Sequence, residues 1–201
     1  MQVKQITNSD IKDVVNIHIM SFENFFLTSL GKKFLTVYYN CVRKDSNGLL
    51  LGCYQDDVLI GFCAACLYSK GFNAKLISHN FLKFLWVGLQ ILFTKPKSLI
   101  RLFKNLTKKD PNINDNGDYS ELLSIAVNPN KQGLGVGQKL LNRLEQDLVA
   151  KSCSKLSLTT DYHNNEKTIH FYEGLGYRVM YEFITYPNRK MYRMIKILSQ
   201  N

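Results

Sequence analysis

Residues 126–148 read AVNPNKQGLGVGQKLLNRLEQDL, and three glycines, Gly133, Gly135 and Gly137, alternate directly before an amphipathic run. The N–H groups at the start of a helix have no intrahelical partner and lie at the positive end of the helix dipole. Glycine permits positive φ angles and lets a ligand approach the main chain closely. The stretch therefore predicts a phosphate-binding turn at a helix start. A glycine-rich turn without a ligand is the alternative.

The spacing of these glycines narrows the kind of phosphate site. A dinucleotide-binding turn requires G-x-G-x-x-G with an acidic residue on the next strand, and a P-loop requires G-x-x-x-x-G-K-[ST]. The chain has G-x-G-x-G at 133–137, which matches neither pattern. We therefore expect a phosphate-bearing ligand of another class.

The composition is that of an ordinary globular chain. Its 201 residues fit one domain, and 45% of them are hydrophobic and 21% charged. The first ten residues, MQVKQITNSD, contain no apolar segment of the secretory type. The longest apolar run, 84–93, is interrupted by Gln90 and has about half of a membrane-spanning length. We therefore expect a cytoplasmic protein.

Cysteine usage agrees with a reducing compartment. The chain has five cysteines and a single C-x-x-C pair, Cys63 and Cys66, which lies inside an apolar, strand-like run. One such pair without a second is weak evidence for a zinc or redox site, and buried free thiols are common in proteins. We expect no bound metal.

The charge is distributed unevenly along the chain. The formal net charge is +10, and no acidic residue occurs from 58 to 109. The basic residues between 70 and 109 are Lys70, Lys75, Lys83, Lys95, Lys97, Arg101, Lys104, Lys108 and Lys109. This segment is either a solvated basic face or a surface that attracts a phosphorylated ligand, anionic lipid or nucleic acid. Dedicated nucleic-acid binding is not expected, because no recognised motif for it occurs.

Hydrophobic periodicity and turn residues predict a mixed α/β order of elements. Strands are expected at 2–6, 49–54, 58–68, 120–127, 155–161, 177–185 and 190–198, and helices at 11–20, 31–42, 80–94, 97–106, 135–151 and 165–175. Pro96 separates the two helical runs of the basic segment, and 110–118 is rich in turn residues. The strand–helix–strand unit over 120–161 predicts a crossover between parallel strands.

The glycine turn, QGLGVG at 132–137, resembles the Q/R-x-x-G-x-G/A acetyl-CoA motif of the GNAT superfamily of N-acetyltransferases. LLSIAVNP resembles the fourth strand of that family, and NNEKTIHFYEGLGYRV resembles its N-x-x-A-x-x-F-Y-x-x-x-G-F/Y signature. The positions in register are Asn165, Phe171, Tyr172, Gly176 and Tyr177, with Thr168 in place of the usual Ala and Tyr177 in place of the commoner Phe. The element order resembles the family over 1–68 and 118–197, and the motifs are specific over 120–178.

The resemblance implies an α/β GNAT-type N-acetyltransferase fold in a single domain, 1–201. A basic helical insertion at about 70–117 then separates the third and fourth strands. The implied function is transfer of an acetyl group from acetyl-CoA to a primary amine of a small molecule, such as an amino sugar. A protein or peptide N-acetyltransferase is one alternative. A non-catalytic acyl-CoA-binding or membrane-associated module is another.

The resemblance also implies roles for single residues. Main-chain groups of Ile125 and Val127 would pair with the pantetheine arm, and the Val127 N–H would contact the acetyl oxygen. Tyr172 would protonate the departing sulfur. The complete set of residues implied in acetyl-CoA binding is Ile125, Val127, Gln132, Gly133, Leu134, Gly135, Val136, Gly137, Asn165 and Tyr172.

A free alkyl amine is mostly protonated at neutral pH, so the site needs a proton acceptor. Strict alternation in the strand 120–127 places Glu121, Leu123, Ile125 and Val127 on one face. The resemblance makes Glu121 the candidate base, because a glutamate at the matching position is the general base in some members of that family, often through water. A solvent-facing carboxylate at a strand end is the alternative for Glu121. Candidate acceptor contacts are Glu23, Asp161 and His163. We interpret His18 as a structural residue of the first helix, with a functional role as the lesser alternative.

The apolar residues of the basic segment need a partner of their own. They are Phe81, Leu82, Phe84, Leu85, Trp86, Leu89, Leu92 and Phe93, which are too many for one narrow helical stripe. Burial in the core or a homodimer contact is the preferred explanation. Peripheral membrane contact by a basic amphipathic helix is the second, and a lid over an anionic acceptor is the third.

Overall fold

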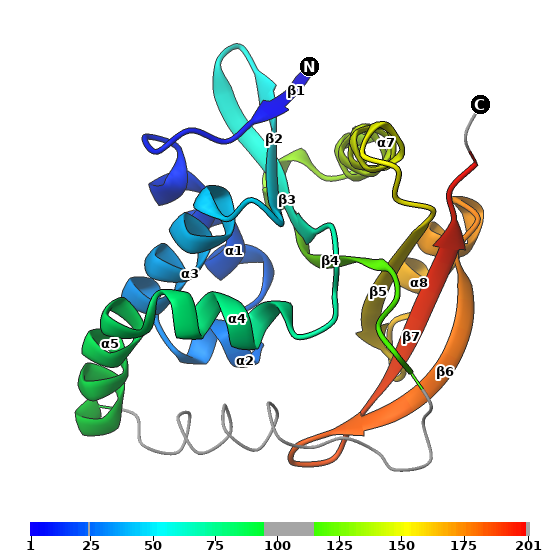
Figure 1. The fold of residues 1–201 in the computed structure, drawn as a ribbon. Coiled ribbons are helices and arrows are strands. Elements are labelled where there is room, and N and C mark those ends of the chain that lie inside the picture. The colour runs from blue at the N-terminus through cyan, green and yellow to red at the C-terminus, as the bar shows by residue number, and fades with distance from the viewer. Residues whose placement is uncertain (24, 95–114, 200–201) are drawn as a thin grey trace.

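Seven strands form one mixed sheet in the computed structural model, which describes residues 1–23, 25–94 and 115–199. The strands are β1 (Gln2–Gln5), β2 (Gly48–Gln55), β3 (Val58–Cys66), β4 (Ser120–Val127), β5 (Lys155–Asp161), β6 (Arg178–Thr185) and β7 (Arg189–Ile197). Their order in the sheet is β1-β2-β3-β4-β5-β7-β6 (Figure 1). β4 and β5 are parallel, and every other neighbouring pair is antiparallel.

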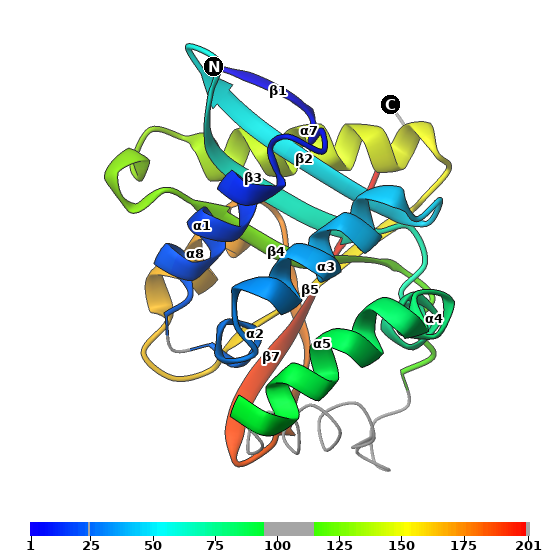
Figure 2. The same ribbon diagram turned by 90° about the vertical axis from the view of Figure 1, so that its left-hand side faces the viewer.

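Helices cover both faces of this sheet. The helices are α1 (Ile11–Ser21), α2 (Phe26–Ser29), α3 (Lys32–Lys44), α4 (Phe72–His79), α5 (Phe81–Thr94), α7 (Val136–Ala150) and α8 (Glu166–Gly174), with a short 3-10 turn, η1, at Pro129–Lys131. Figures 1 and 2 show α1 and α3 on one face and α7 on the other. α7 connects β4 to β5, so the predicted crossover between parallel strands is confirmed.

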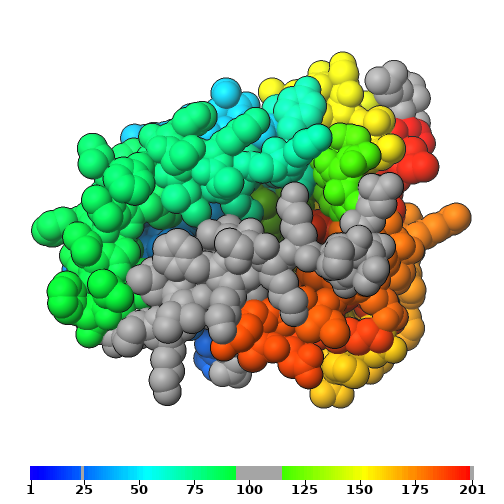
Figure 3. Space-filling view, turned by 60° about the horizontal axis from the view of Figure 1, so that its bottom comes forward, coloured from blue at the N-terminus to red at the C-terminus, as the bar shows by residue number. Residues whose placement is uncertain are grey.

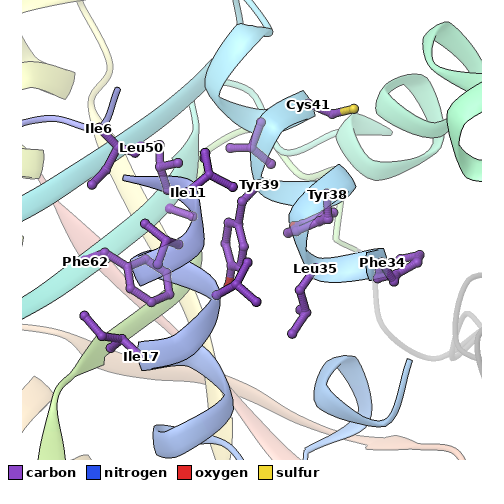
Figure 4. Close-up of a cluster of buried hydrophobic side chains, with 14 of the residues drawn as sticks. Ile6, Ile11, Ile17, Phe34, Leu35, Tyr38, Tyr39, Cys41, Leu50 and Phe62 are labelled. Carbon is purple, nitrogen blue, oxygen red and sulfur yellow. The ribbon is translucent and has the colours of Figure 1, made fainter. Parts of the chain in front are cut away.

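Each face of the sheet has its own core. We call the buried side chains on the α1 and α3 face the first core cluster; they include Val14, Val15, Leu35, Tyr39, Val42 and Phe62. Figure 4 shows Tyr39 between the two helices. The second core cluster, on the α7 face, includes Leu140, Leu141, Leu144, Leu148, Leu156 and Met194. The i, i+4 repeat of the α7 leucines explains why this helix lies flat on the sheet.

Most predicted elements match the described ones within two residues. β4 and β5 have the predicted bounds, and the last two strands form the predicted antiparallel pair. The sequence missed α4, because the charged residues of the basic segment obscure its short apolar stripe, and it missed the single turn α2. The helix predicted at 97–106 and most of the loop predicted at 110–118 lie outside the described residues.

Helix α5 packs on α3 and adds its buried stripe to the first core cluster. The Phe84 ring lies 5.7 Å from the Phe34 ring, and Phe84, Val87 and Ile91 form its buried stripe. Of the eight apolar residues that the sequence analysis assigned to burial or a dimer contact, only Phe84 is buried within the chain. The exposed ones are Phe81, Leu82, Leu85, Trp86, Leu89, Leu92 and Phe93. Burial in the core therefore explains only Phe84 of that set, and the homodimer contact stays a prediction.

Candidate active site

The site begins where β4 and β5 separate. Among the described residues, the two strands pair only at Ser120–Leu122 with Leu156–Leu158. The Asn128 N–H donates to the Ile60 oxygen at 2.9 Å, toward β3. Because main-chain groups alternate in direction along a strand, those of Ile125 and Val127 point away from β3 and into the gap. The gap thus has an exposed strand edge, which an extended ligand with amide groups can extend as an added strand.

The glycine turn closes one end of this gap. Gly133 and Gly135 have φ angles of 78° and 72°, in the left-handed region that favours glycine. Gly135 is the N-cap of α7, so the free N–H groups of the first turn of α7 follow it directly. A Cβ at Gly137 would lie 3.4 Å from the Phe171 ring, so this glycine allows close packing of α7 on α8. Local geometry thus supports the predicted anion site.

The gap and the turn are parts of one cleft of about 1050 Å³. The predicted site residues that line it are Ile125, Val127, Gln132, Gly133, Gly135, Val136, Gly137, Asp161, Asn165 and Tyr172. The predicted residues outside its lining are Glu23, Glu121, Leu134 and His163. Leu134 is half exposed at the tip of the turn, and the side chains of Glu23 and His163 are exposed to solvent.

Tyr172 lies on α8 with its ring against the second core cluster and lines the cleft. It is 6% exposed, and its ring centroid is 5.3 Å from that of Phe171 and 5.7 Å from that of Tyr177. Burial raises the pKa of the Tyr172 phenol well above its ordinary value. The hydroxyl therefore keeps its proton at neutral pH and can only act as a proton donor or hydrogen-bond partner.

Asn165 joins the end of β5 to the start of α8. Its Nδ2 donates to the Thr160 hydroxyl at 2.6 Å and to the Asp161 carbonyl oxygen at 3.0 Å. Because α8 starts at the next residue, these bonds fix the direction in which α8 leaves the sheet and carries Tyr172 to the cleft. The geometry gives Asn165 an orienting role beside the predicted cofactor contact.

The prediction that Glu121 shares a strand face with Ile125 and Val127 is wrong. The register of β4 against β3 shifts by one residue, so that Leu123 has no partner on β3 and forms a bulge. Leu123 accordingly packs against the first core cluster, whereas Ile125 and Val127 pack against the second. An extra residue in a strand moves all following side chains to the opposite face of the sheet. A prediction that assumes strict alternation cannot include such a bulge.

Glu121 is held in a polar cluster outside the cleft lining. Its carboxylate accepts hydrogen bonds from the Arg193 guanidinium, at 2.5 Å, and from the Ser69 hydroxyl. Both members of the ion pair are mostly buried, with side-chain exposures of 18% and 14%. The hydrogen bonds from the guanidinium and the hydroxyl hold both carboxylate oxygens away from the cleft lining. The catalytic role of Glu121 stays a prediction, and this ion pair argues against it.

Asp161 and Arg189 form the wall of the cleft opposite α1. The Arg189 guanidinium donates to both oxygens of the Asp161 carboxylate in a forked ion pair. The same guanidinium lies 4.4 Å from the centroid of the Phe25 ring. Of the three predicted acceptor contacts, only Asp161 is therefore placed to meet a ligand, and its charge is already neutralised.

Helix α1 contributes two cleft residues, His18 and Ser21, beyond the predicted set of site residues. His18 and Ser21 lie one turn apart near the end of α1, and both line the cleft. The Ser21 hydroxyl donates to the Val127 oxygen at 3.1 Å, and the His18 Nδ1 lies 2.7 Å from the Tyr39 hydroxyl. Burial lowers the pKa of His18 to about 4. His18 continues the apolar stripe of α1, so its spacing alone resembles that of a core residue.

Comparison with known proteins gives a consistent result. A family model described as the acetyltransferase (GNAT) family matches residues 11–177. The fold is similar to that of the ribosomal-protein-S18-alanine N-acetyltransferase from Escherichia coli, with 15% identity over 100% of this chain and 95% of that one and a TM-score of 0.63. An aminoglycoside 6'-acetyltransferase of type Ii has 15% identity, a TM-score of 0.62, and coverage of 100% and 99%. The PaiA N-acetyltransferase from Thermoplasma acidophilum, in complex with coenzyme A, has 14% identity, 98% coverage of both chains and a TM-score of 0.58.

Proposed function

The chain belongs to the acetyltransferase (GNAT) family, and we propose that it moves the acetyl group of acetyl-CoA to a primary amine of a small molecule. The observation that carries the proposal is the split between β4 and β5, which leads from a glycine turn at one end to Tyr172 and α1 at the other. This single cleft offers an anion site, a free strand edge and a protonated phenol in that order.

The residues present fit acetyl-CoA as the donor. The N–H groups at the start of α7 suit the pyrophosphate, and the side chains of Lys131 and Lys167 line the same cleft. The amides of the pantetheine arm suit the main-chain edge at Ile125 and Val127. The Val127 oxygen already accepts a bond from Ser21, so the free groups of this edge are the N–H of Val127 and both groups of Ile125. We propose that one of these N–H groups contacts the acetyl oxygen.

The reaction requires two proton movements at the site. The lone pair of the amine forms the new N–C bond while the C–S bond of the thioester breaks. The nitrogen loses one proton to an acceptor, and the Tyr172 hydroxyl gives its proton to the leaving sulfur. The proton lost by the amine then returns to the tyrosinate through water in the cleft, which restores Tyr172. Burial keeps the Tyr172 phenol protonated, so the proton is present on the hydroxyl when the thiolate forms.

Charge in the cleft indicates the kind of acceptor. Among the described lining residues, Asp161 is the only carboxylate, and Arg189 neutralises it. The whole chain has a formal net charge of +10. A polycation such as a polyamine or an aminoglycoside would meet repulsion without compensating carboxylates. We therefore propose an acceptor whose remainder is neutral or anionic, such as a nucleotide-linked amino sugar.

The aromatic wall of the acceptor side agrees with a ring-shaped acceptor. Phe22, Phe25 and Phe26 line the cleft beside α1, and Arg189 lies over the Phe25 ring. Aromatic faces pack on the apolar face of a sugar, and a guanidinium binds phosphate in a forked geometry. These features favour a small phosphorylated sugar over an extended peptide.

Thiol release from acetyl-CoA tests the proposal. The panel contains nucleotide-linked amino sugars, free amino sugars, polyamines, aminoglycosides and short peptides. We expect release with the amino sugars and an upward shift of the melting temperature with acetyl-CoA. Release with peptides alone would replace the small-molecule proposal with protein acetylation. A melting shift without any release would support a non-catalytic acyl-CoA-binding module, and the absence of both would refute the donor site.

A further inference from the structure

We infer that His18 accepts the proton of the attacking amine, and that Tyr39 positions the His18 imidazole. This inference rests on the proposed acetyl transfer and adds a catalytic residue to it. His18 comes from α1 and Tyr39 from α3. The two side chains therefore join neighbouring helices of one layer beside the cleft.

The first observation is a buried nitrogen without a partner. His18 is 2% exposed, its Nδ1 contacts the Tyr39 hydroxyl at 2.7 Å, and its Nε2 has no hydrogen-bond partner among the described residues. Buried polar atoms are nearly always paired, and leaving one unpaired costs about 1–3 kcal/mol. Because His18 also lines the cleft, a group of the bound acceptor is the natural partner for Nε2.

The second observation is that no other residue of the cleft is suited to the task. The remaining ionisable side chains among the described lining residues are Lys131, Asp161, Lys167, Tyr172 and Arg189. The lysines are cations, Asp161 and Arg189 neutralise each other, and Tyr172 is protonated. The imidazole of His18 is neutral at physiological pH, because burial holds its pKa at about 4. It is therefore the free lone pair that the amine can meet.

The third observation is the support behind the imidazole. The Tyr39 hydroxyl lies 2.7 Å from His18 Nδ1. Figure 4 shows Tyr39 between α1 and α3, and its ring centroid lies 5.2 Å from that of Phe62. A hydroxyl in such apolar surroundings keeps the partner that it has, so Tyr39 holds the Nδ1 side of the ring and leaves the Nε2 lone pair for the acceptor.

The proton taken up by His18 has a balanced path out of the site. As the N–C bond forms, the amine proton moves to the lone pair of His18 Nε2, while the Nδ1–H stays hydrogen-bonded to the Tyr39 oxygen. The imidazolium then gives the Nε2 proton to water in the cleft, and this water returns a proton to the Tyr172 oxygen, which lost one to the leaving sulfur. His18 and Tyr172 both return to their starting states. Burial makes the imidazolium unfavourable, so it gives up its proton readily.

Position along β4 supports this assignment. Ser21, one turn after His18, donates to the Val127 oxygen. The imidazole is thus tied by α1 to the strand edge where the proposed donor pairs. An amine that enters from the α1 side meets His18 beside that edge, while Tyr172 approaches from α8 across the cleft.

Steady-state kinetics of His18→Gln test the inference with the best acceptor of the panel. We expect kcat/KM to fall by about 10²–10⁴-fold, the range for loss of a general base, with the melting shift by acetyl-CoA unchanged. His79→Gln, at an exposed histidine of α4, is the matched control and should behave as wild type. Tyr39→Phe removes the hydrogen bond that positions an intact imidazole, and we expect a smaller loss of roughly tenfold.

Chemical rescue separates catalysis from a structural role. Added imidazole should restore part of the turnover of His18→Ala and none of that of Tyr172→Phe. The inference fails if His18→Gln keeps kcat/KM within about twofold of wild type, or if imidazole rescues nothing while acetyl-CoA still binds the variant. Wild-type protein that releases no thiol with any amine would instead refute the proposed function and this inference together.

An independent observation concerns the outer face of α5, formed by Phe81, Leu82, Leu85, Trp86, Leu89, Leu92 and Phe93. We propose that this outer face docks on an anionic membrane surface. Leu82, Trp86 and Phe93 are 78%, 67% and 85% exposed. Figure 3 shows this part of the chain, in green, at one edge of the molecule. Single exposed apolar residues are normal, but a contiguous set on one helix marks an interaction surface.

Charge identifies the partner. α2, α3, α4 and α5 contain no Asp or Glu. Lys32 and Lys33 share a shallow groove with Trp86, and Lys75 and Lys83 lie on α4 and α5. An apolar helix face whose charged neighbours among the described residues of α2 to α5 are cations matches anionic headgroups above an acyl interior. Among the described helices none is long enough to span a membrane alone, and α4 and α5 meet at 93°, so we propose a helix that lies on the surface.

Trp86 is the only tryptophan of the chain, so intrinsic fluorescence reports on this face alone. We expect a blue shift with vesicles of phosphatidylglycerol and phosphatidylcholine, loss of the shift in high salt, and none with phosphatidylcholine alone. Phe93→Ser should weaken the shift, whereas Val58→Ser, at an exposed apolar residue of β3, should not. No shift with anionic vesicles would refute docking. A blue shift that appears without vesicles when the protein concentration is raised would mean that the outer face binds a second copy of the chain instead of lipid.

Discussion

The cleft and the outer face of α5 differ in what they leave unsatisfied: the cleft contains an unpaired buried polar atom, and the outer face contains exposed apolar side chains. The cleft buries a polar atom, His18 Nε2, which has no hydrogen-bond partner in the described part of the chain, whereas the outer face exposes large apolar side chains to water. Each is unfavourable by itself, and each indicates a contact that completes it. An unpaired nitrogen is satisfied by one hydrogen-bonding group at one position, so it indicates a specific ligand atom. Apolar burial has no direction and does not distinguish one apolar partner from another. The charges around the outer face must therefore identify its partner.

The largest expected effect tests the polar side of this comparison. Tyr172→Phe removes one hydroxyl and leaves the ring in the second core cluster. We expect kcat to fall by about 10²–10⁴-fold, because the thiolate then leaves without a proton donor. The measurement is thiol release at saturating acetyl-CoA, with the dissociation constant for acetyl-CoA as the control. Turnover equal to wild type would remove Tyr172 from the mechanism.

The next effect separates the two faces of α5. Ile91 is 4% exposed in the buried stripe, and Leu92 beside it is 47% exposed. Ile91→Ala should lower the free energy of unfolding by about 2–5 kcal/mol, the usual cost of a cavity at a buried aliphatic residue. Leu92→Ala should change it by less than about 0.5 kcal/mol, because little packing is lost there. Denaturant unfolding of both variants measures the difference. Equal losses would mean that the outer face is covered in solution.

Local features of the site could be predicted from the sequence, whereas features that depend on distant residues could not. The glycine turn was predictable, because the positive φ angles of Gly133 and Gly135 favour glycine at those positions themselves. The bulge at Leu123 is not local: it depends on the register of β4 against β3 and leaves no mark in SELLSIAV. The proposed role of His18 could not be predicted for a related reason. Its helical spacing is that of a core residue, and its hydrogen-bond partner Tyr39 lies 21 positions away in the sequence.

Protonation of His18 gives a third effect. Its pKa is about 4 in the folded protein and about 6.5 when exposed, so between these values the unfolded chain binds more protons. Stability is therefore complete above pH 6.5 and falls by up to roughly 3 kcal/mol as the pH drops from 6.5 to 4. The titratable side chain that faces the imidazole is Tyr39, which stays protonated throughout because burial raises its pKa.

The difference between wild type and His18→Gln isolates this effect. Denaturant unfolding at pH 7.5 and pH 4.5 should show a steeper loss for wild type than for the variant, since glutamine does not titrate. Parallel losses would mean that His18 is hydrated in the folded protein, which would also weaken its assignment as a neutral proton acceptor.

The smallest effect compares one glycine from each region. Gly135 caps α7 at φ 72°, and Gly88 lies inside α5; a Cβ at either position meets no atom within 4 Å. Both positions therefore have room for a methyl group, and they differ only in backbone conformation. Gly135→Ala should lower the free energy of unfolding by about 1–2 kcal/mol, because an alanine is strained at positive φ. Gly88→Ala should raise it by about 0.5–1 kcal/mol, because alanine is the better helix residue.

Affinity for acetyl-CoA completes this comparison. Relaxation of the turn in Gly135→Ala would redirect the N–H groups at the start of α7, so we expect roughly tenfold weaker binding by calorimetry, equivalent to about 1.4 kcal/mol. Gly88→Ala should bind as wild type does. If both variants bind acetyl-CoA equally well, the positive φ angle at Gly135 serves the fold of the turn alone, and the pyrophosphate must be held by side chains such as Lys131 and Lys167.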